Sequence, residues 1–258
     1  MKIIVLVKEV PDTYGDRKLS LETGLADRAA SDTVLDEIGE RALEVALTHA
    51  DKNADTEVVV MSMAPEESAT TVRKALAIGA GSAVHIADEA LAGADLTLTA
   101  QVLAAAIQRT GYDLVITGNL STDGSGGVIP AMIAELLNVP QLTALTSVEI
   151  SADGVKGQRA TDAGTMDVAA PLPAVISITE RMPDARFPNF KGIMAAKKKP
   201  FQTMTLADLD IDAEDHSFSR SIVLSIAEKP PRSGGVKIVD EGDAGEKLAE
   251  FLVQNRLV

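Results

Sequence analysis

The feature that most constrains the fold is a regular alternation of short aliphatic runs and helical patterns over residues 1–140. The aliphatic runs are rich in Val and Ile, which is typical of strands buried on both faces of a parallel sheet. Between the runs, apolar residues recur at the spacing of one helical face. The runs occupy residues 3–7, 57–61, 83–86 and 113–117. This alternation predicts an α/β fold with a doubly wound, mainly parallel sheet, whose ligands bind beyond the carboxyl ends of the strands.

A glycine-rich loop, GNLSTDGSGG at residues 118–127, separates the last of these predicted strands from a helical pattern at residues 129–136. Glycines at this place let backbone N–H groups approach a phosphate, and the start of the next helix adds positive potential. The loop matches neither GxGxxG nor GxxxxGK[ST], so a glycine-rich connection without a ligand is the alternative. A pyrophosphate-cleaving loop would follow the first strand, where KEVPDT stands instead. The sequence therefore argues against an ATP-cleaving activity.

After residue 140 the pattern changes to short strands. Residues 147–150, 155–159 and 174–178 are predicted strands, and the Asp-Gly pair at residues 153–154 predicts a tight hairpin. Because this rhythm differs from the first part, we expect extra short strands beside the parallel sheet.

The carboxyl-terminal residues are predicted to form an arm. It begins with a predicted strand at residues 221–226, continues through Pro and Gly breaks, and ends with an amphipathic helix. The apolar face of this helix holds Leu248, Phe251 and Leu252. We expect one α/β domain at residues 1–220 and the arm at residues 221–258.

Composition narrows the possible partners. The formal net charge of −14 repels phosphate backbones and anionic lipid, so neither nucleic acid nor a membrane is expected as the main partner. Cysteine is absent, which excludes disulfides, thiolate nucleophiles and cysteine-ligated metals from the chain. The initial apolar run ends at Lys8 and Glu9 and is too short for a secretory signal or a membrane span. We expect a cytoplasmic protein without membrane insertion.

Catalytic and metal sites have little support in the sequence. His49, His85 and His216 are far apart and lack HxxxH or HxH spacing, so we interpret them as ordinary surface or strand-end residues. Acidic residues are abundant, but abundance alone does not identify a catalytic pair of carboxylates. We therefore expect no catalytic residue and no metal in this chain.

The segment ARFPNFKGIMAAKKKP, residues 185–200, stands out because it contains no acidic residue in so acidic a chain. One interpretation places its lysines at the end of a short helix that begins after Pro188, where positive charge is favourable. A second interpretation starts from Phe187 and Phe190, two of only five phenylalanines, in a segment too polar for a core. Exposed aromatic residues of this kind indicate a docking anchor.

Several segments, in this order, resemble the β-subunit family of electron transfer flavoproteins. They are VLVKEVPDT, VLDEIGERALEVAL, MSMAP, VRKALAIGA, VITGNLSTDGSGG, LPAVISITE with RFPNFKGIMAAKKK, and PPRSGGVKIV. The resemblance covers essentially the whole chain. It implies a Rossmann-like adenine-nucleotide-binding domain and a heterodimer with an α subunit.

The resemblance also implies two cofactors, a structural AMP and one FAD that lies mostly in the α subunit. The loop at residues 11–14 would contribute to the flavin side, and AMP would lie near the strand ends and the glycine-rich loop. Relatives often carry Asn, Gln and Thr late in this loop, where this chain has Gly, Val and Ile, so the phosphate contacts implied here are those of Asp123 and the backbone. The implied cofactor-binding residues are Leu6, Thr13, Thr33, Val34, Leu35, Asp36, Met63, Gly118, Asn119, Leu120, Ser121, Thr122, Asp123, Gly124, Ser125, Gly126, Gly127, Val128 and Ile129. In electron-bifurcating relatives a second FAD takes the place of AMP, which is the alternative here; an empty site ranks third.

By the same resemblance, the chain would be an electron carrier without catalysis of its own. Electrons would pass from dehydrogenases, as in fatty acid oxidation, to a quinone-linked oxidoreductase, both of which bind transiently. Residues 183–199 would form the partner recognition loop, and the arm would pack on the α subunit. The implied partner contacts are Arg186, Phe187, Phe190, Ile193 and Met194. A nucleotide-binding regulatory module of the same fold group is the chief alternative, and a small-molecule enzyme is a third.

Overall fold

The structure is a computed structural model that describes residues 1–15, 17–215, 217–232, 234–235 and 237–258. The prediction for His216 therefore lies outside the described residues. The chain divides into two compact units, Met1–Leu224 and Ser225–Val258, which are described separately.

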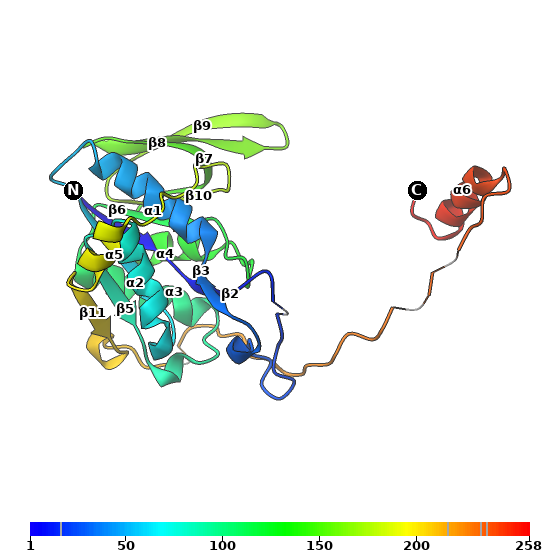
Figure 1. The fold of residues 1–258 in the computed structure, drawn as a ribbon, viewed down its shortest axis with the longest axis horizontal. Helices are drawn as coiled ribbons and strands as arrows, with labels where there is room; N and C mark the ends of the chain where they lie inside the picture. Colours follow the sequence, from blue (N-terminus) through cyan, green and yellow to red (C-terminus); the bar gives the residue numbers. More distant parts are fainter. Residues whose placement is uncertain (16, 216, 233, 236) are drawn as a thin grey trace. The chain divides into compact units, whose positions relative to one another are not determined.

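The larger unit is built on a sheet that has nine strands in the described residues, in the order β11-β5-β4-β1-β6-β10-β7-β8-β9 (Figure 1). Neighbouring strands are parallel except for the last two pairs, β7–β8 and β8–β9, which are antiparallel. The strands are β1 (Lys2–Leu6), β4 (Glu57–Met63), β5 (Ser82–Ile86), β6 (Leu114–Gly118), β7 (Gln141–Ile150), β8 (Gly154–Thr161), β9 (Gly164–Pro171), β10 (Ala174–Ile178) and β11 (Phe201–Met204).

Helices cover both faces of this sheet. The core between the sheet and one helical layer includes residues of α1 (Glu37–Ala50) and α2 (Ala69–Ile78), and the core on the opposite face includes residues of α3 (Leu96–Thr110) and α4 (Ile129–Leu137). Within β1, Ile3 and Val5 belong to the first core and Ile4 to the second, and all three are fully buried. Burial on both faces explains why the central strands are continuous aliphatic runs. The predicted doubly wound, mainly parallel α/β fold is confirmed.

Shorter elements complete the larger unit. A separate two-stranded antiparallel sheet pairs β2 (Glu9–Pro11) with β3 (Thr33–Leu35), and the helix α5 (Phe190–Ala196) begins where the sequence predicts one after Pro188. Asn189 caps α5 by accepting a hydrogen bond of 2.8 Å from the N–H of Gly192. Single 3-10 turns are η1 (Arg28–Ala30), η2 (Glu66–Ser68), η3 (Glu89–Leu91) and η4 (Ala207–Leu209).

One predicted strand is wrong. Residues 221–226 form no strand in the described structure, and Ile222, Val223 and Leu224 are exposed. An aliphatic run becomes a strand only when a neighbouring chain pairs with its backbone and covers a face, and here neither happens. The smaller unit contains the predicted terminal helix, α6 (Ala244–Gln254), none of whose residues is buried.

Candidate functional site

The site expected from the sequence lies where the winding of the sheet reverses. From β1 the chain proceeds to β4 and β5 on one side, and then to β6 on the other side of β1. The carboxyl ends of β4, β1 and β6 therefore meet at one edge, which brings together Leu6, Met63 and Gly118. Open α/β sheets bind ligands in the crevice at such a switch point.

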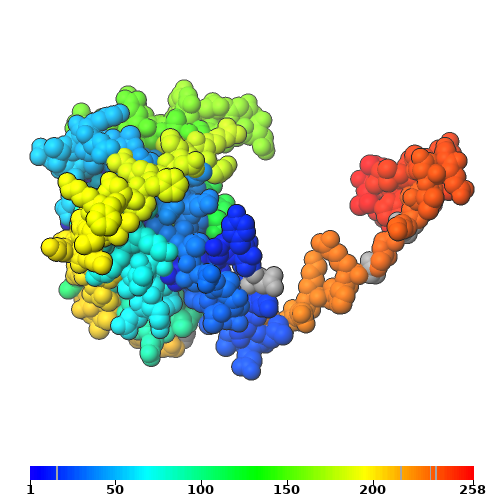
Figure 2. Space-filling view, in the orientation of Figure 1, coloured from blue at the N-terminus to red at the C-terminus, as the bar shows by residue number. Residues whose placement is uncertain are grey.

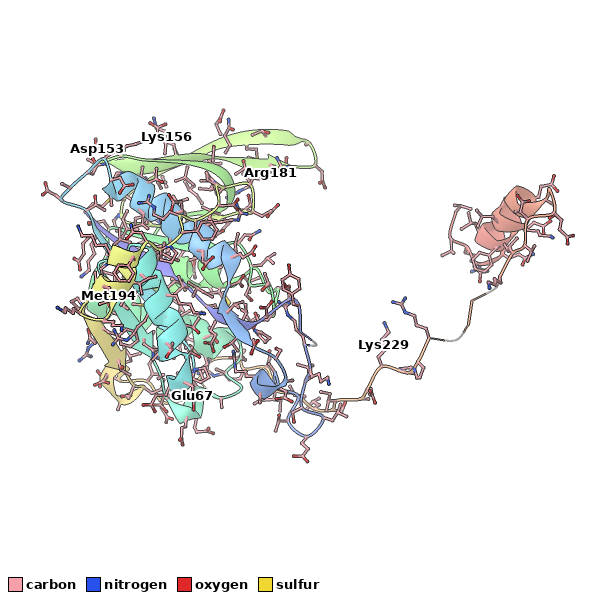
Figure 3. All side chains as sticks on the ribbon, in the orientation of Figure 1. Glu67, Asp153, Lys156, Arg181, Met194 and Lys229 are labelled. Atoms are coloured by element: carbon pink, nitrogen blue, oxygen red, sulfur yellow. The ribbon has the colours of Figure 1, made fainter. Side chains whose placement is uncertain are left out.

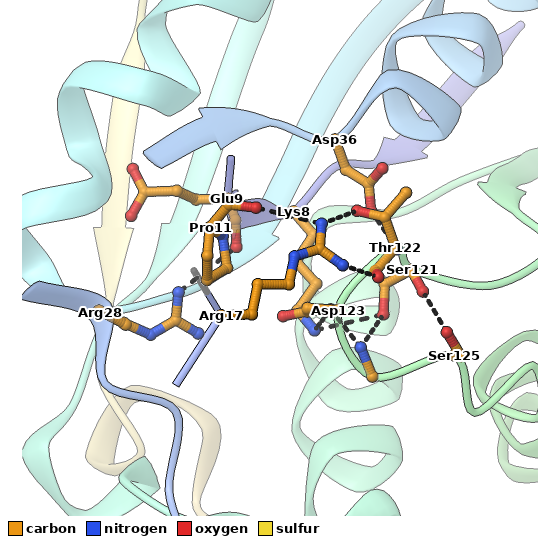
Figure 4. Close-up of polar contacts among 11 residues, drawn as sticks. Lys8, Glu9, Pro11, Arg17, Arg28, Asp36, Ser121, Thr122, Asp123 and Ser125 are labelled. Atoms are coloured by element: carbon orange, nitrogen blue, oxygen red, sulfur yellow. Dashed lines mark hydrogen bonds and ion pairs between the residues drawn. The ribbon is translucent and has the colours of Figure 1, made fainter. Parts of the chain in front are cut away.

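A lysine and an aspartate join the two sides of this crevice (Figure 4). Lys8, just after β1, places its Nζ 2.7 Å from Asp123 Oδ1 and 3.4 Å from Ser121 Oγ, both in the loop after β6. Burial alone would raise the pKa of Asp123, but the hydrogen bond and positive charge of Lys8 outweigh it and lower that pKa. Lys8 was not among the predicted site residues, and no local sequence signal marks it, because both partners of its side chain lie in the loop after β6.

Asp36 holds the glycine-rich loop through a hydrogen bond with its backbone. It precedes α1, is 2% exposed, and accepts a 2.9 Å hydrogen bond at Oδ2 from the backbone N–H of Thr122. Burial raises the pKa of Asp36, and the negative charge of Asp123 adds to the effect. Its second oxygen, Oδ1, is buried without a hydrogen-bond partner in the described structure. A polar group in this state fits a site that a further molecule completes.

The end of the glycine-rich loop offers free backbone donors. Within the described part of the chain, the N–H groups of Gly126, Gly127 and Val128 donate no hydrogen bond, and all three residues are exposed just before α4 begins. Gly127 has a φ of +67°, a conformation that suits glycine and turns the chain into the helix. Free N–H groups at the start of a nine-residue helix suit an anion such as a phosphate. The residues present thus fit the phosphate group of a ligand.

The beginning of the same loop has another purpose. A Cβ added to Gly118 would lie 2.6 Å from Ile38 Cγ2, so glycine is needed there for α1 to pack against β6. The next two backbone N–H groups are already used, because Asn119 donates to Ile178 O at 2.8 Å and Leu120 donates to the side chain of Asn119 at 2.9 Å. Free donors are therefore concentrated at the end of the loop.

The segment KEVPDT forms β2 and the turn after it. Its pairing with β3 places Thr33, Val34 and Leu35 opposite residues 9–11. These three predicted site residues therefore follow the segment that leaves β1, although neither β2 nor β3 was predicted from the sequence. Periodicity could not reveal strands of three residues.

The predicted flavin-side loop extends from this small sheet. Arg17 ties it to the glycine-rich loop, donating to Pro11 O at 3.2 Å and to both the carbonyl and the hydroxyl of Thr122. Thr13 and Tyr14 lie at the tip, and the Tyr14 side chain is 99% exposed. The Tyr14 ring is thus free to contact another molecule, and the role of this loop at a flavin stays a prediction.

The predicted recognition segment lies over α1 and α2, and Figure 2 shows it in yellow beside these helices, blue and cyan. Phe187 is 95% exposed and Phe190 is 80% exposed, with Ile193 and Met194 also exposed. The predicted exposure of the aromatic residues is confirmed, while their role as anchors stays a prediction. Arg186 behaves differently, because its guanidinium forms ion pairs with Glu44 and Asp51 of α1.

Other site types find little support in the structure. In the described residues no group of three or more His, Cys, Asp or Glu could hold a metal ion, and none of the described helices has the length and hydropathy needed to cross a membrane. His85 lies next to the end of β5, as one of the two predicted alternatives has it; it is buried there, and its Nε2 lies 3.0 Å from Ala64 O. A surface hollow of about 780 Å³ lies at the opposite, amino-terminal edge of the strands, lined by residues such as Lys2 and Ser82. Lys8, Asp36 and residues 118–128 lie together at the switch point, and this part of the surface is called the shelf below.

Comparisons with known proteins agree with this geometry. Residues 23–209 match the model of the electron transfer flavoprotein domain. The chain is 44% identical to the electron transfer flavoprotein subunit beta of Mycobacterium tuberculosis and to that of Mycobacterium leprae, over 99% of both chains in each case. It is 31% identical to the protein of the same name from Syntrophomonas wolfei, over 98% of this chain and 96% of the relative. The chain therefore belongs to the electron transfer flavoprotein family, among its β subunits.

Proposed function

We propose that the chain is the β subunit of a heterodimeric electron carrier that holds a structural AMP and helps an α subunit to hold one FAD. The observation that supports this most directly is the shelf at the switch point, where Lys8 and Asp36 both contact a glycine-rich loop whose last backbone N–H groups are free. Asp36 also keeps a buried carboxylate oxygen without a partner in the described structure, and the chain matches β subunits along its whole length. The carrier has no catalytic residue of its own.

AMP would be held mainly by the backbone. The free N–H groups of residues 126–128 and the start of α4 would bind its phosphate, and the Lys8–Asp123 pair would keep the loop in place. Leu6, Met63 and residues 33–36 would surround the rest of the nucleotide at the ends of the strands. Such a nucleotide would stabilise the subunit because it binds only the folded form.

FAD, when bound, supplies the electron-transfer chemistry, and the protein supplies binding and orientation. In this chain, Thr13 and Tyr14 would approach the flavin from the loop that Arg17 tethers. The α/β domain, residues 1–220, would form the nucleotide-binding scaffold, and the arm, residues 221–258, would pack on the α subunit through the exposed apolar face of α6.

The recognition segment would select the redox partners. Phe187, Phe190, Ile193 and Met194 present an apolar surface that an electron-donating dehydrogenase of fatty acid oxidation could cover, with a quinone-linked oxidoreductase as acceptor. Burying one such side chain contributes roughly 1.5–3 kcal/mol, about one or two decades in affinity, which suits a brief encounter. All of this would take place in the cytoplasm.

Counting cofactors tests the proposal. The chain is co-expressed with its α subunit, the heterodimer is denatured, and the released adenine nucleotide and flavin are quantified by chromatography. We expect one AMP and one FAD per heterodimer. Two FAD and no AMP would favour a second flavin in the shelf, and a chain that is stable alone and binds no flavin with any α subunit would contradict the proposal.

Two variants locate the nucleotide. Asp123→Ala with Gly126→Val should release AMP, because the first removes the partner of Lys8 and the second adds bulk beside a free N–H group. Asp162→Ala, which removes an exposed charge in the turn between β8 and β9, is the control and should keep full AMP. Full AMP in the double variant would show that the nucleotide binds elsewhere.

A further inference from the structure

The recognition segment is attached to the helical layer at both ends. At its amino-terminal end, the segment is attached to α1, where Arg41 donates a hydrogen bond to Met182 O and forms an ion pair with Asp184. On its exit side, Lys199 donates to three carbonyl groups at the end of α2, with distances of 2.9 Å to Leu76 O and 2.6 Å to Ala80 O. The exposed apolar side chains lie between these two attachments.

Arg186 makes the most extensive of these contacts. Its backbone N–H and Nε donate to Glu44 Oε2 at 3.0 and 2.9 Å, and its Nη2 donates to Glu44 Oε1 at 2.9 Å and to Asp51 Oδ2 at 2.9 Å. Glu44 and Asp51 are seven residues apart on α1 and therefore lie on one helical face. A planar guanidinium held in this way fixes both position and direction, which a lysine cannot do.

The charges of this cluster reinforce one another. Burial alone would raise the pKa of Glu44, but its hydrogen bonds with Arg186 outweigh burial and lower that pKa, so the carboxylate stays ionised at neutral pH. The hydrogen bonds that Arg186 donates to Glu44 and Asp51 raise the pKa of Arg186. All three guanidinium nitrogens of Arg186 donate hydrogen bonds within this cluster, so the side chain already has partners inside its own chain.

The helix α5 is held closely as well. A Cβ added to Gly192 would lie 2.5 Å from Ala77 O of α2, so the two helices are in direct backbone contact, and Ala196 is buried beneath α5. Phe187 follows Arg186 directly, and Phe190 begins α5. The backbone on either side of these two phenylalanines is therefore attached to α1 and α2 within the chain itself.

We propose that Arg186 is a positioning residue, which through Glu44 and Asp51 holds Phe187 and Phe190 in the conformation that enters an apolar pocket of the dehydrogenase. This rests on the proposed role of the segment in partner recognition. Ordering a flexible loop costs roughly 1–2 kcal/mol for each residue fixed, so a segment ordered in advance binds more tightly without any added contact. A brief encounter complex, which buries little surface, gains most from this saving.

The test compares, in the heterodimer, one arginine of the segment with a second arginine that lies two residues before the segment. Arg186→Gln removes the cluster, whereas Arg181→Gln removes the same charge from an exposed residue, labelled in Figure 3, whose side chain makes no hydrogen bond or ion pair in the described structure. The electrostatic attraction of a partner changes equally in both. Reduction of the heterodimer by an acyl-CoA dehydrogenase is measured against heterodimer concentration, and amide hydrogen exchange of residues 187–196 is measured without the dehydrogenase.

For Arg186→Gln we expect KM for the heterodimer to rise about tenfold, the effect of fixing about one residue, with kcat and FAD content unchanged and faster exchange in α5. Arg186→Lys should rescue only part of this, and Arg181→Gln should change little. If both glutamine variants give the same KM while Phe190→Ala raises it, the segment recognises partners but Arg186 does not position it. If Phe190→Ala also leaves KM unchanged, both the positioning role and the recognition role are wrong. If Arg186→Gln does not fold, as judged by FAD content, Glu44→Gln with Asp51→Asn tests the same contacts from α1.

Discussion

At the scale of single residues, the shelf depends on a few charges that compensate one another. Lys8 forms an ion pair with Asp123, and the buried carboxylate of Asp36 accepts a hydrogen bond from the N–H of Thr122. The two carboxyl groups respond to burial in opposite ways, because Asp123 has a cationic partner and Asp36 has none in the described structure. Of the two carboxyl groups beside the proposed phosphate site, Asp123 is thus paired with a cation, and Asp36 has its pKa raised by burial.

Asp123→Asn should lower the free energy of unfolding of the heterodimer at pH 7 by about 0.5–1 kcal/mol, the low value reflecting a lysine side chain that is 42% exposed. The pKa of Asp123 is lowered in the folded state, so its contribution is fully present above the ordinary aspartate pKa of about 3.9. The contribution is lost as the pH falls through the lowered folded value. Urea denaturation at fixed protein concentration measures it, with Asp162→Asn as the control. A difference between wild type and variant that persists unchanged at the lowest pH would contradict the assignment of the pair.

Residues of this kind were only partly predictable. Asp123 and the glycines were found because a glycine-rich loop between a strand and a helix has a physical meaning that is local in sequence. Lys8 and Arg17 were not, because their importance comes from Ser121 and Thr122, more than a hundred residues away. Arg186 was assigned to the partner for the same reason, since its pairing with α1 is a long-range contact.

At the scale of elements, the helices and central strands could be predicted from the sequence. A helix with one buried face has apolar residues at every third or fourth position, and a strand buried on both faces is a continuous apolar run. The elements that were missed are β2, β3, β9 and β11, which are short, at an edge or largely exposed. They exist because a neighbouring strand supplies hydrogen bonds, as β8 does for β9. The wrongly predicted strand at residues 221–226 is the opposite case, because this aliphatic run has no neighbouring strand to pair with in the described structure.

The contact between α1 and β6 gives an element-scale prediction. Gly118→Ala should cost about 1–3 kcal/mol of stability, because the added methyl group would meet Ile38 at 2.6 Å and would force α1 away from the strand. Ile38→Ala in the same chain should recover part of this loss, since it removes the atoms that clash. Thermal unfolding of the two single variants and the double variant measures the coupling energy. Additive losses would mean that Gly118 is needed for another reason, such as approach to the nucleotide.

At the scale of the whole molecule, the chain consists of a folded unit and a carboxyl-terminal unit whose described residues belong to neither hydrophobic core. Unit Met1–Leu224 contains both hydrophobic cores, whereas α6 in unit Ser225–Val258 has no buried residue. An amphipathic helix of eleven residues is marginal in water unless its apolar face is covered. Within the proposed heterodimer, the α subunit would supply that cover.

Introducing negative charge on the apolar face of α6 should therefore weaken assembly with the α subunit without affecting the folding of the β subunit. Leu248→Asp with Phe251→Asp places two carboxylates on the face proposed to contact the α subunit, so we expect the affinity between subunits to fall by at least tenfold, since each buried side chain contributes roughly 1.5–3 kcal/mol. Glu246→Lys with Glu250→Lys alters two acidic residues of the same helix and serves as the control. Co-purification of a tagged α subunit measures assembly, and circular dichroism of the separate β subunits measures folding. Normal assembly with the aspartates would show that α6 has another role, and a loss of the α/β fold itself would show that the arm stabilises its own chain.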